Sequence, residues 1–392
     1  MRANSYSSWL SVIVLSLAAV IFVTAELLPI GILHEIGDTY KKPVGTIGLI
    51  VTGYACVVGI SAIFSTSLFI NIERKKLLLI LLISFGISNF IVAYAPSISI
   101  LYIGRVIGAF SHGLFWSIIG PLAVRLVPGG GKARATSFVF GGIAIATVAV
   151  VPLGTFFSQK IGWKQSFFAI GLTSLIIAAI IIIIMPKLKQ SVEQNRVSLI
   201  KLISRPYLRR TFPVTTLALC GHFCALTYIG PILETRVGIM HAQLPVYLLC
   251  FGIFGVLGNI IAGFLKDNML VLMTRITLGS MAISVFGTAF ISTNSPILAY
   301  VFVAIWGLGI CLLTVTLQSL ILKLAPDAGD KASSIHVAMF NAGIGFGALI
   351  GGLLINNFGS EITAAVGGTL LFLSLLILLP HVETKTPYEV NI

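Results

Sequence analysis

The sequence predicts an all-α polytopic membrane protein, with twelve transmembrane helices in two pseudo-symmetric six-helix bundles. Three observations lead to this fold class. The 392-residue chain is 57% hydrophobic and only 9% charged, and its mean hydropathy is +1.06. Apolar runs of roughly 20 residues, enough for a helix to cross a bilayer, recur along the chain. The second half also repeats features of the first half at a nearly constant offset.

The apolar runs are continuous rather than alternating, which favours membrane-spanning helices over a β-barrel. Most connections between them are short. The predicted spans, in chain order, cover residues 9–32, 46–70, 77–95, 100–126, 136–158, 166–185, 211–233, 244–265, 270–291, 297–324, 333–355 and 362–380.

The first span contains Glu26, the only carboxylate deep in the apolar spans of the first half. At a rise of about 1.5 Å per residue, Glu26 and Arg105 of the fourth span lie at compatible depths in the outer half of the membrane. A carboxylate that alternates between apolar and cationic surroundings takes up and releases a proton. Glu26 is therefore predicted to couple transport to protons, the alternative being a static ion at the outer interface.

The fourth span, Leu101–Leu126, carries Arg105, His112 and Trp116 on one helix face. An arginine in hydrocarbon costs roughly 2.5–3.5 kcal/mol on insertion scales, and intramembrane charges commonly mark a transport pathway. An imidazole titrates near neutral pH and can relay protons. Arg105 and His112 are thus predicted to join Glu26 in proton coupling. The alternatives are an arginine paired with a neighbouring carbonyl and a neutral core histidine.

Other features of the first six spans suggest gating. Pro152 in the fifth span removes a backbone hydrogen bond and can bend the helix, while glycines such as Gly154 allow close helix approach. We predict that this span deforms during transport, although the same glycines would also serve static packing. Three loop charges are predicted to lock the inward-closed or the inward-open state: Arg74, Lys75 and, in the second half, Asp267. The alternative is that these charges only set the orientation of the chain in the membrane.

A long basic connection, residues 186–210, separates the two predicted bundles, 1–185 and 211–392. Of the 25 Lys and Arg residues, 19 fall on the side of the termini, 5 on the other side, and Arg105 is the remainder. This bias predicts cytoplasmic termini. The net charge of +13 therefore reflects membrane topology rather than nucleic-acid binding.

The two halves repeat one another in sequence. The run RLVPGGGKARATS, from Arg125, matches KLAPDAGDKASS, from Lys323, at an offset of 197 to 198 residues. Gly162 and Gly359 share the offset of 197, each just after a glycine-rich helix. Two homologous bundles of the same membrane orientation form a parallel repeat, the arrangement of transporter halves around a central cavity.

Several motifs resemble those of the major facilitator superfamily, within it the bacterial drug:H+ antiporter branch, and most closely its sugar efflux transporters. The resemblance covers nearly the whole chain. The motifs are TAELLPIG from Thr24, the L-x3-R pair ending at Arg105, AFSHGLF from Ala109, P-L-G from Pro152 followed by GWK from Gly162, and FNAGIGFG from Phe340. The chain departs from the family patterns at Thr66, Ile70 and Val150.

The resemblance implies a proton-coupled antiporter of the bacterial inner membrane that exports small neutral solutes by alternating access. Sugars such as arabinose or galactosides are the implied substrates. Drug (chloramphenicol-like) or purine nucleoside antiport in the same fold remains open, and a non-transporting receptor or membrane enzyme is a distant alternative. The resemblance also implies a monomer.

A sugar site needs hydrogen-bonding partners for hydroxyls and often an aromatic platform. Six residues within the spans offer these groups: Trp116, His222, Tyr228, Trp306, Gln318 and Asn341. The alternative for the aromatic residues is ordinary packing, and for Asn341 it is a helix–helix hydrogen bond. We expect no metal or other cofactor, because the five cysteines lie within spans and suit packing. The sequence shows no catalytic or ATP-binding motif, so uphill transport would draw on an ion gradient and no enzyme activity is expected.

Overall fold

The computed structural model describes residues 5–68, 72–126, 138–139, 142–143, 145–186, 202–290, 295–325 and 327–379. All regular elements in these ranges are helical, which confirms the all-α fold class. The chain divides into two compact units. Unit 1 comprises residues 1–193 and 242–249, and unit 2 comprises residues 194–241 and 250–392.

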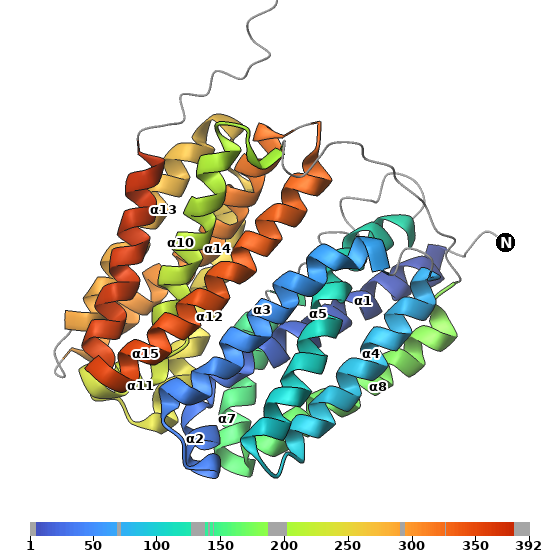
Figure 1. Cartoon of the computed structure of the whole chain (residues 1–392), viewed down its shortest axis with the longest axis horizontal. Helices are drawn as coiled ribbons and strands as arrows, with labels where there is room; N and C mark the ends of the chain where they lie inside the picture. The colour runs from blue at the N-terminus through green and yellow to red at the C-terminus, as the bar shows by residue number, and fades with distance from the viewer. Residues whose placement is uncertain are drawn as a thin grey trace, which may run out of the picture. The chain divides into compact units, whose positions relative to one another are not determined.

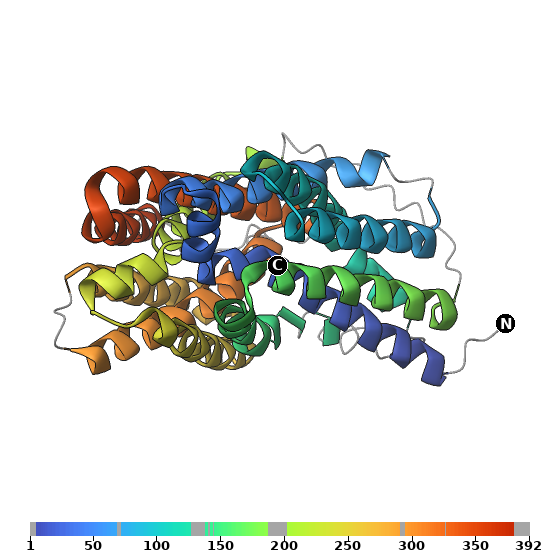
Figure 2. The same cartoon turned by 90° about the horizontal axis from the view of Figure 1, so that it is seen from below.

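Most of unit 1 is built from the first six predicted spans. Its elements are α1 (Ser5–Leu27), η1 (Leu28–Gly31), α2 (Leu33–Tyr40), α3 (Val44–Leu68), α4 (Arg74–Ala93), α5 (Ile98–Leu126), the π-helical η2 (Ala146–Val150), α7 (Val151–Ile161) and α8 (Trp163–Ile184). Helix α4 packs against α5 and α8, and α3 packs against α5 (Figure 1). Figure 2 shows α1 beside α8.

The remaining predicted spans follow in order. Their elements are α10 (Leu208–Leu226), α11 (Ile229–Arg236), η3 (His241–Gln243), α12 (Leu244–Gly263), η4 (Asp267–Met269), α13 (Leu270–Phe290), α14 (Pro296–Leu324) and α15 (Gly329–Leu378). The first part of α12 belongs to unit 1 and the rest to unit 2. Within unit 2, α15 packs along α10 and α13, and α13 packs along α14.

Nine helices among the described residues are long and apolar enough to cross a membrane, and α10 with α11 adds a span bent by 55°. Helix α15 contains the last two predicted spans, which meet at Gly359, where φ is 82° and ψ is −176°. Only glycine adopts such a backbone at little cost. The predicted fifth span lies partly outside the described residues, and its described part contains η2 and α7.

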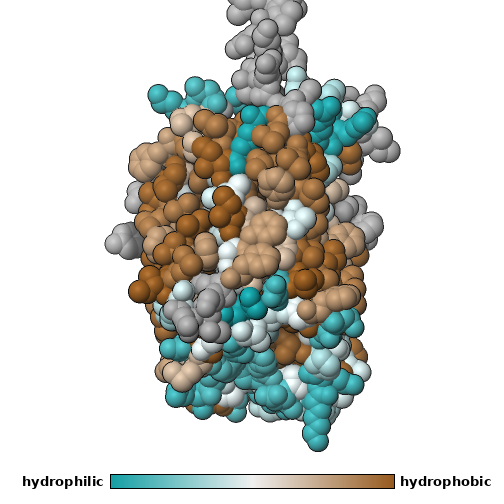
Figure 3. All heavy atoms as spheres, turned by 90° about the vertical axis from the view of Figure 1, so that its left-hand side faces the viewer, coloured by the Kyte–Doolittle hydropathy of each residue, from teal (hydrophilic) through white to brown (hydrophobic). Residues whose placement is uncertain are grey.

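The outer surface of unit 2 suits a lipid environment. Figure 3 shows a face with a broad apolar field, and hydrophilic residues gather above and below that field. Helix α13 exposes large apolar side chains at intervals of four and seven residues, which places them on one face: Leu272, Ile276, Ile283 and Phe290. An apolar face of this size on an exposed helix marks contact with lipid or a partner rather than with water.

Each unit closes the end of its last helix with a basic side chain from its third span. Lys75 Nζ, at the start of α4, donates hydrogen bonds to the carbonyls of Ile182 and Met185, at 2.9 and 2.6 Å, at the end of α8. Arg275 of α13 donates to the carbonyls of Leu378 and Leu379 at the end of α15. A cation at a helix C-terminus satisfies free carbonyls and complements the helix dipole.

Candidate functional site

A buried polar cluster in unit 1 joins three helices. Glu26 comes from the end of α1, Tyr54 from α3, and Arg105, His112 and Trp116 from α5. Arg105, His112 and Tyr54 are 4%, 1% and 2% exposed, and the Glu26 side chain is 18% exposed. The structure thus brings together the three predicted proton-coupling residues. It adds Trp116, which was predicted as a solute contact, and Tyr54, which was not predicted.

His112 lies at the centre of this cluster. The Trp116 indole N–H donates a hydrogen bond to His112 Nε2. Because an indole nitrogen can only donate, His112 Nε2 carries no proton in this arrangement. The neutral ring then carries its proton on Nδ1 and donates it to the Tyr54 hydroxyl oxygen, 2.8 Å away. The Glu26 Oε2 atom lies 3.7 Å from the same Nε2 atom.

The Arg105 guanidinium links α5 to α1 and α3. Its Nη1 donates to the Ala25 carbonyl at 2.6 Å, and its Cζ lies 4.0 Å from the centroid of the Tyr54 ring, a cation–π contact. No ion pair joins Arg105 to Glu26 in the described part of the chain, and the guanidinium pairs with the Ala25 carbonyl instead. The role of Arg105 in proton coupling stays a prediction. The Nε and Nη2 atoms of Arg105 are buried without a hydrogen-bond partner among the described residues.

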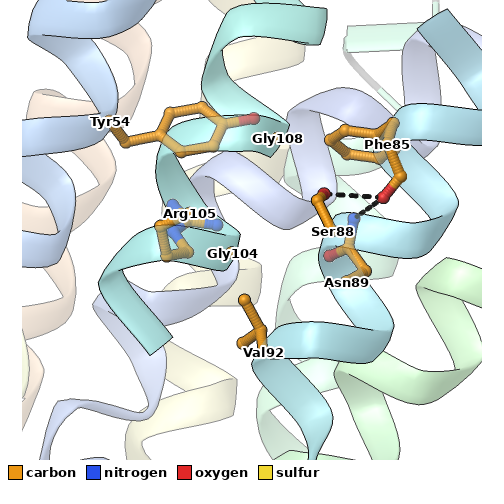
Figure 4. A pocket seen from close by; sticks show the side chains of 8 residues that line it. All are labelled: Tyr54, Phe85, Ser88, Asn89, Val92, Gly104, Arg105 and Gly108. Carbon is orange, nitrogen blue, oxygen red and sulfur yellow. Dashed lines mark hydrogen bonds between the residues drawn. The ribbon is translucent and has the colours of Figure 1, made fainter. Parts of the chain in front are cut away.

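A small pocket lies beside Arg105, between α3, α4 and α5 (Figure 4). It leaves no room for a water molecule. Ser88 and Asn89 turn their polar groups to the Phe85 carbonyl, at 2.7 Å each, rather than to the guanidinium. The free nitrogens of Arg105 are therefore not satisfied by these neighbours, which leaves the guanidinium able to take another acceptor when its surroundings change.

Aromatic side chains surround the polar cluster. The Phe22 ring lies 4.0 Å from Phe85, 4.2 Å from Phe115 and 5.3 Å from His112, measured between centroids. All three phenylalanines are fully buried. Such a shell excludes water and strengthens electrostatic interactions inside it.

Unit 2 contains a second histidine–tryptophan pair. The Trp306 indole of α14 donates to His222 Nδ1 of α10 at 2.8 Å. This fixes the proton of the neutral imidazole on Nε2. The rings of Phe223, Phe251 and Trp306 surround the imidazole at centroid distances of 4.8, 6.2 and 5.7 Å. His222 and Trp306, both predicted as solute contacts, therefore lie together in an aromatic setting.

The other predicted solute contacts of unit 2 form hydrogen bonds with other partners. The Tyr228 hydroxyl, at the bend between α10 and α11, donates to the Ala348 carbonyl at 2.9 Å. The Gln318 amide donates to Ser333 at 2.8 Å, and Asn341 donates to the Val337 carbonyl one turn earlier in its own helix. Each of these polar groups is engaged by the fold, so a solute would have to compete for it.

The predicted gating residues occupy distinct positions. Lys75 caps α8 as described above, and Arg74 begins α4. Pro152 stands at the start of α7, directly after the π-helical η2, and Gly154 faces Leu28 of η1. The predicted deformation of the fifth span therefore coincides with a π-helical segment, a feature frequent at functional sites. Asp267 begins η4, and its side chain lies outside the described part of the structure.

Sequence reasoning missed an ion pair at one end of unit 2. Arg205, just before α10, forms two hydrogen bonds of 2.7 and 2.6 Å with the Asp327 carboxylate, between α14 and α15. These hydrogen bonds hold the pKa of the Asp327 carboxyl below its usual value. Asp327 belongs to the repeated KLAPDAGDKASS run, but its partner is more than a hundred residues away, so no local pattern predicts the contact.

Long apolar helices with exposed apolar side chains, and polar side chains buried among them, define a polytopic membrane protein. A family model described as the Major Facilitator Superfamily matches residues 14–329. The chain belongs to this superfamily, as its motifs suggested.

Solved structures share the fold along almost the whole chain. The crystal structure of a D-xylose-proton symporter matches with a TM-score of 0.77 at 16% identity, covering 97% of this chain and 98% of that chain. A partially occluded inward-open conformation of the xylose transporter XylE from E. coli matches with a TM-score of 0.76 at 16% identity, covering 97% and 99%. The human organic anion transporter MFSD10 matches with a TM-score of 0.70 at 15% identity, covering 94% and 98%. These neighbours differ in substrate, so the likeness defines the fold and not the solute.

Proposed function

We propose that this protein is a proton-coupled secondary exporter of small neutral solutes, with sugars as the favoured class, in the inner membrane of a bacterium. The observation that carries the proposal is the buried Glu26–His112–Arg105 cluster. An ionisable group deep in a transmembrane helix bundle commonly belongs to a proton or substrate pathway. Here a carboxylate, an imidazole and a guanidinium lie within one aromatic shell.

Proton coupling needs a group that binds a proton in one state and releases it in another. Glu26 can do so if its surroundings change between an apolar shell and a free guanidinium. Arg105 has two nitrogens without hydrogen-bond partners among the described residues. Its third nitrogen donates to the carbonyl of Ala25, the residue directly before Glu26. A shift of α1 against α5 would offer these nitrogens to the Glu26 carboxylate and expel its proton. Both helices belong to unit 1, so this shift would be a rearrangement within one half during alternating access.

The sugar assignment rests on the resemblance to sugar efflux transporters and on the chemistry of unit 2. His222 presents an Nε2–H donor among the rings of Phe251 and Trp306. A donor beside aromatic faces suits the hydroxyls and C–H faces of a sugar. The D-xylose-proton symporter of the same fold is consistent with this class. Export rather than import, and antiport rather than symport, follow from the motif resemblance.

The test uses purified protein in proteoliposomes that contain an internal pH dye. A pH gradient is imposed, and arabinose, a galactoside, chloramphenicol or a purine nucleoside is added in turn. Proton flux with a sugar alone supports sugar:H+ antiport. Flux with chloramphenicol or the nucleoside replaces the substrate class, and no flux with any of the four contradicts the proposal.

We predict that Glu26→Gln abolishes gradient-driven transport but keeps exchange of labelled solute between equal internal and external pools. Glutamine preserves the shape of the side chain and removes its proton chemistry, and exchange needs no net proton movement. Glu361→Gln is the matched control, because Glu361 forms an exposed ion pair with Arg236 at 3.1 Å outside the cluster. Undiminished gradient-driven transport in Glu26→Gln would refute the role of Glu26 in proton coupling.

A further inference from the structure

One nitrogen of His112 faces two different partners. The Trp116 indole donates to Nε2, and the Glu26 Oε2 atom lies 3.7 Å from the same nitrogen. The indole can only donate, and an ionised carboxylate can only accept. The nitrogen cannot serve both at once. Without a proton it accepts from Trp116, and with a proton it can donate only to Glu26.

The structure shows the first of these two arrangements. Nε2 accepts from Trp116, and the Nδ1 proton goes to the Tyr54 oxygen at 2.8 Å. A proton added at Nε2 would point an N–H group at the indole N–H group, and the two donors would repel each other. The same proton would give Glu26 a charge-assisted hydrogen bond, which is stronger than a neutral one.

We propose that Trp116 is a positioning residue that responds to the protonation state of His112. The indole binds Nε2 when the imidazole is neutral and leaves it when the imidazole is protonated, and Glu26 then takes its place. The inference rests on the proposed function, in which this cluster carries the proton. It gives Trp116 a role distinct from the solute contact predicted from sequence.

The charged groups around His112 determine when Glu26 replaces Trp116 as the partner of the imidazole. Glu26 faces it from α1, Tyr54 faces it from α3, and the Arg105 guanidinium lies two helical turns earlier on α5. The guanidinium opposes a second positive charge, whereas the ionised carboxylate favours it. Protonation of His112 therefore depends on a charged Glu26, and Glu26→Gln should hold Trp116 on the imidazole.

Movement of the Trp116 indole away from His112 would change the packing of the fifth span. Trp116 packs in an apolar cluster with Val20 and Val23 of α1, and with Ala146 and Val150 of the π-helical η2. A new indole position requires these side chains to repack, because protein interiors leave little free volume. Pro152 follows directly after η2. The proton state of His112 is thereby passed to the segment predicted to deform during transport.

Unit 2 supplies an internal control. Trp306 donates to His222 in a second indole–imidazole pair, with the hydrogen bond on Nδ1. His222 takes part in none of the ion pairs found among the described residues, in contrast to His112. The second pair therefore contains the same chromophore and the same hydrogen bond without the competing carboxylate. It should not respond to pH over the same range.

Intrinsic tryptophan fluorescence of the purified full-length protein tests the inference. The emission is followed from about pH 8 to about pH 5, the range in which histidine titrates. A protonated imidazole quenches an adjacent indole, and a displaced indole changes its environment. We expect a pH-dependent change no larger than the share of one tryptophan among the four in the chain.

We expect that Trp116→Phe, His112→Gln and Glu26→Gln each abolish the change, whereas Trp306→Phe preserves it. Trp116→Phe keeps an aromatic ring in the apolar cluster, and an unchanged melting temperature would show that the loss is not unfolding. A pH response that persists in Trp116→Phe, or that is missing from the wild type, overturns the inference. The measurement needs no solute and no gradient. A protein that shows the response but moves no solute would refute the proposed function alone.

Discussion

At the scale of single residues, the position of Arg105 explains how the fold tolerates a charge in an apolar span. Its Nη1 atom uses the Ala25 carbonyl at 2.6 Å, and its charge lies over the Tyr54 ring. A desolvated cation–π contact is worth about 2 kcal/mol, and a hydrogen bond from a charged group about 1.5–3 kcal/mol. Together these roughly match the insertion cost of about 2.5–3.5 kcal/mol. The charge is therefore stable without an ion pair, and Glu26 stays available for protons.

Asp327 gives a prediction of pH dependence outside the membrane-spanning helices. A carboxyl whose pKa is lowered by folding stabilises the folded state above its ordinary pKa of 3.8, and this contribution is lost as pH falls through the lowered value. We predict that Asp327→Asn lowers the melting temperature by the same small amount at about pH 8 and about pH 5, since the carboxyl is ionised at both. Asp38→Asn on α2 is the control, and Asp38 forms none of the ion pairs found in the described ranges. A destabilisation that disappears by about pH 5 would contradict the ion-pair explanation.

The residues of the cluster differ in how well the sequence predicts them. Glu26, Arg105 and His112 are polar groups in apolar runs, and the cost of placing them there draws attention to each. Tyr54 is an ordinary residue for a span, and only the three-dimensional contact shows that it holds His112 Nδ1 and lies under Arg105. The Trp116–His112 bond joins residues four apart on one helix, a spacing that places side chains as neighbours. The spacing of His112 and Trp116 was visible in the sequence. The hydrogen bond from the indole to the imidazole was not, because it depends on how the two side chains are oriented.

At the scale of elements, glycines bring corresponding pairs of helices together within each half. In unit 1, Gly31 of η1 lies against Thr155 of α7, so the first span contacts the fifth. In unit 2, Gly343, Gly347 and Gly351 of α15 lie against the backbone or side chains of α10, so the seventh span contacts the eleventh. Small residues at such contacts let helix backbones approach closely in a membrane. The close-packing interpretation of these glycines thus accounts for their positions in the second half.

Gly347 offers a test of this packing. A Cβ atom at this position would meet backbone atoms of Cys220 and Cys224, which cannot move without separating α15 from α10. We predict that Gly347→Ala destabilises the protein by about 1–3 kcal/mol, the usual cost of overpacking. Gly53→Ala in α3 is the matched control, because its Cβ would meet no atom within 4 Å. That control should gain about 0.5–1 kcal/mol from helix propensity.

Thermal unfolding in detergent compares the two alanine variants with the wild type. The melting temperature should fall for the variant at position 347 and rise slightly for the variant at position 53. Equal shifts of the same sign in both variants would show that helix propensity, and not the contact with α10, determines the outcome.

The helix boundaries follow from the sequence where apolar runs end in polar residues. The structure departs from the prediction where local chemistry differs. The last two predicted spans are two helices, as expected, and they meet at a kink whose only non-helical residue is Gly359. The short helix α2 was not predicted, because an eight-residue segment lies below the length that periodicity resolves. The π-helical turn of η2 depends on tertiary packing and leaves no sequence pattern.

At the scale of the whole molecule, the two halves repeat in sequence but not in polar chemistry. Unit 1 holds a carboxylate, a guanidinium and an imidazole together, whereas unit 2 holds a neutral imidazole among aromatic rings. The repeat was visible from the sequence because glycines and loop motifs recur at a fixed offset. The different polar chemistry of the two units was visible only in part, since Glu26, Tyr54 and Trp306 approach the two histidines from other helices. We infer that unit 1 carries the proton and unit 2 the main solute contacts.

The orientation of the chain determines which side of the membrane supplies the proton. The excess of Lys and Arg in alternate loops predicts cytoplasmic termini, and the end of α1 that carries Glu26 then lies toward the outside. A proton entering from an acidic exterior would reach Glu26 first, as export by antiport requires. The predicted orientation fixes the side of every loop, so labelling one loop on each predicted side of the membrane is enough to test it.

Single-cysteine variants in a background without the five native cysteines provide the test. Lys42→Cys lies between α2 and α3, and Lys266→Cys lies between α12 and η4. We predict that a membrane-impermeant maleimide added to intact cells labels position 42 and leaves position 266 unlabelled until the cells are opened. The reverse pattern would place the termini outside. Glu26 would then lie toward the cytoplasm, and the proposed direction of proton entry, and with it export by antiport, would have to be abandoned.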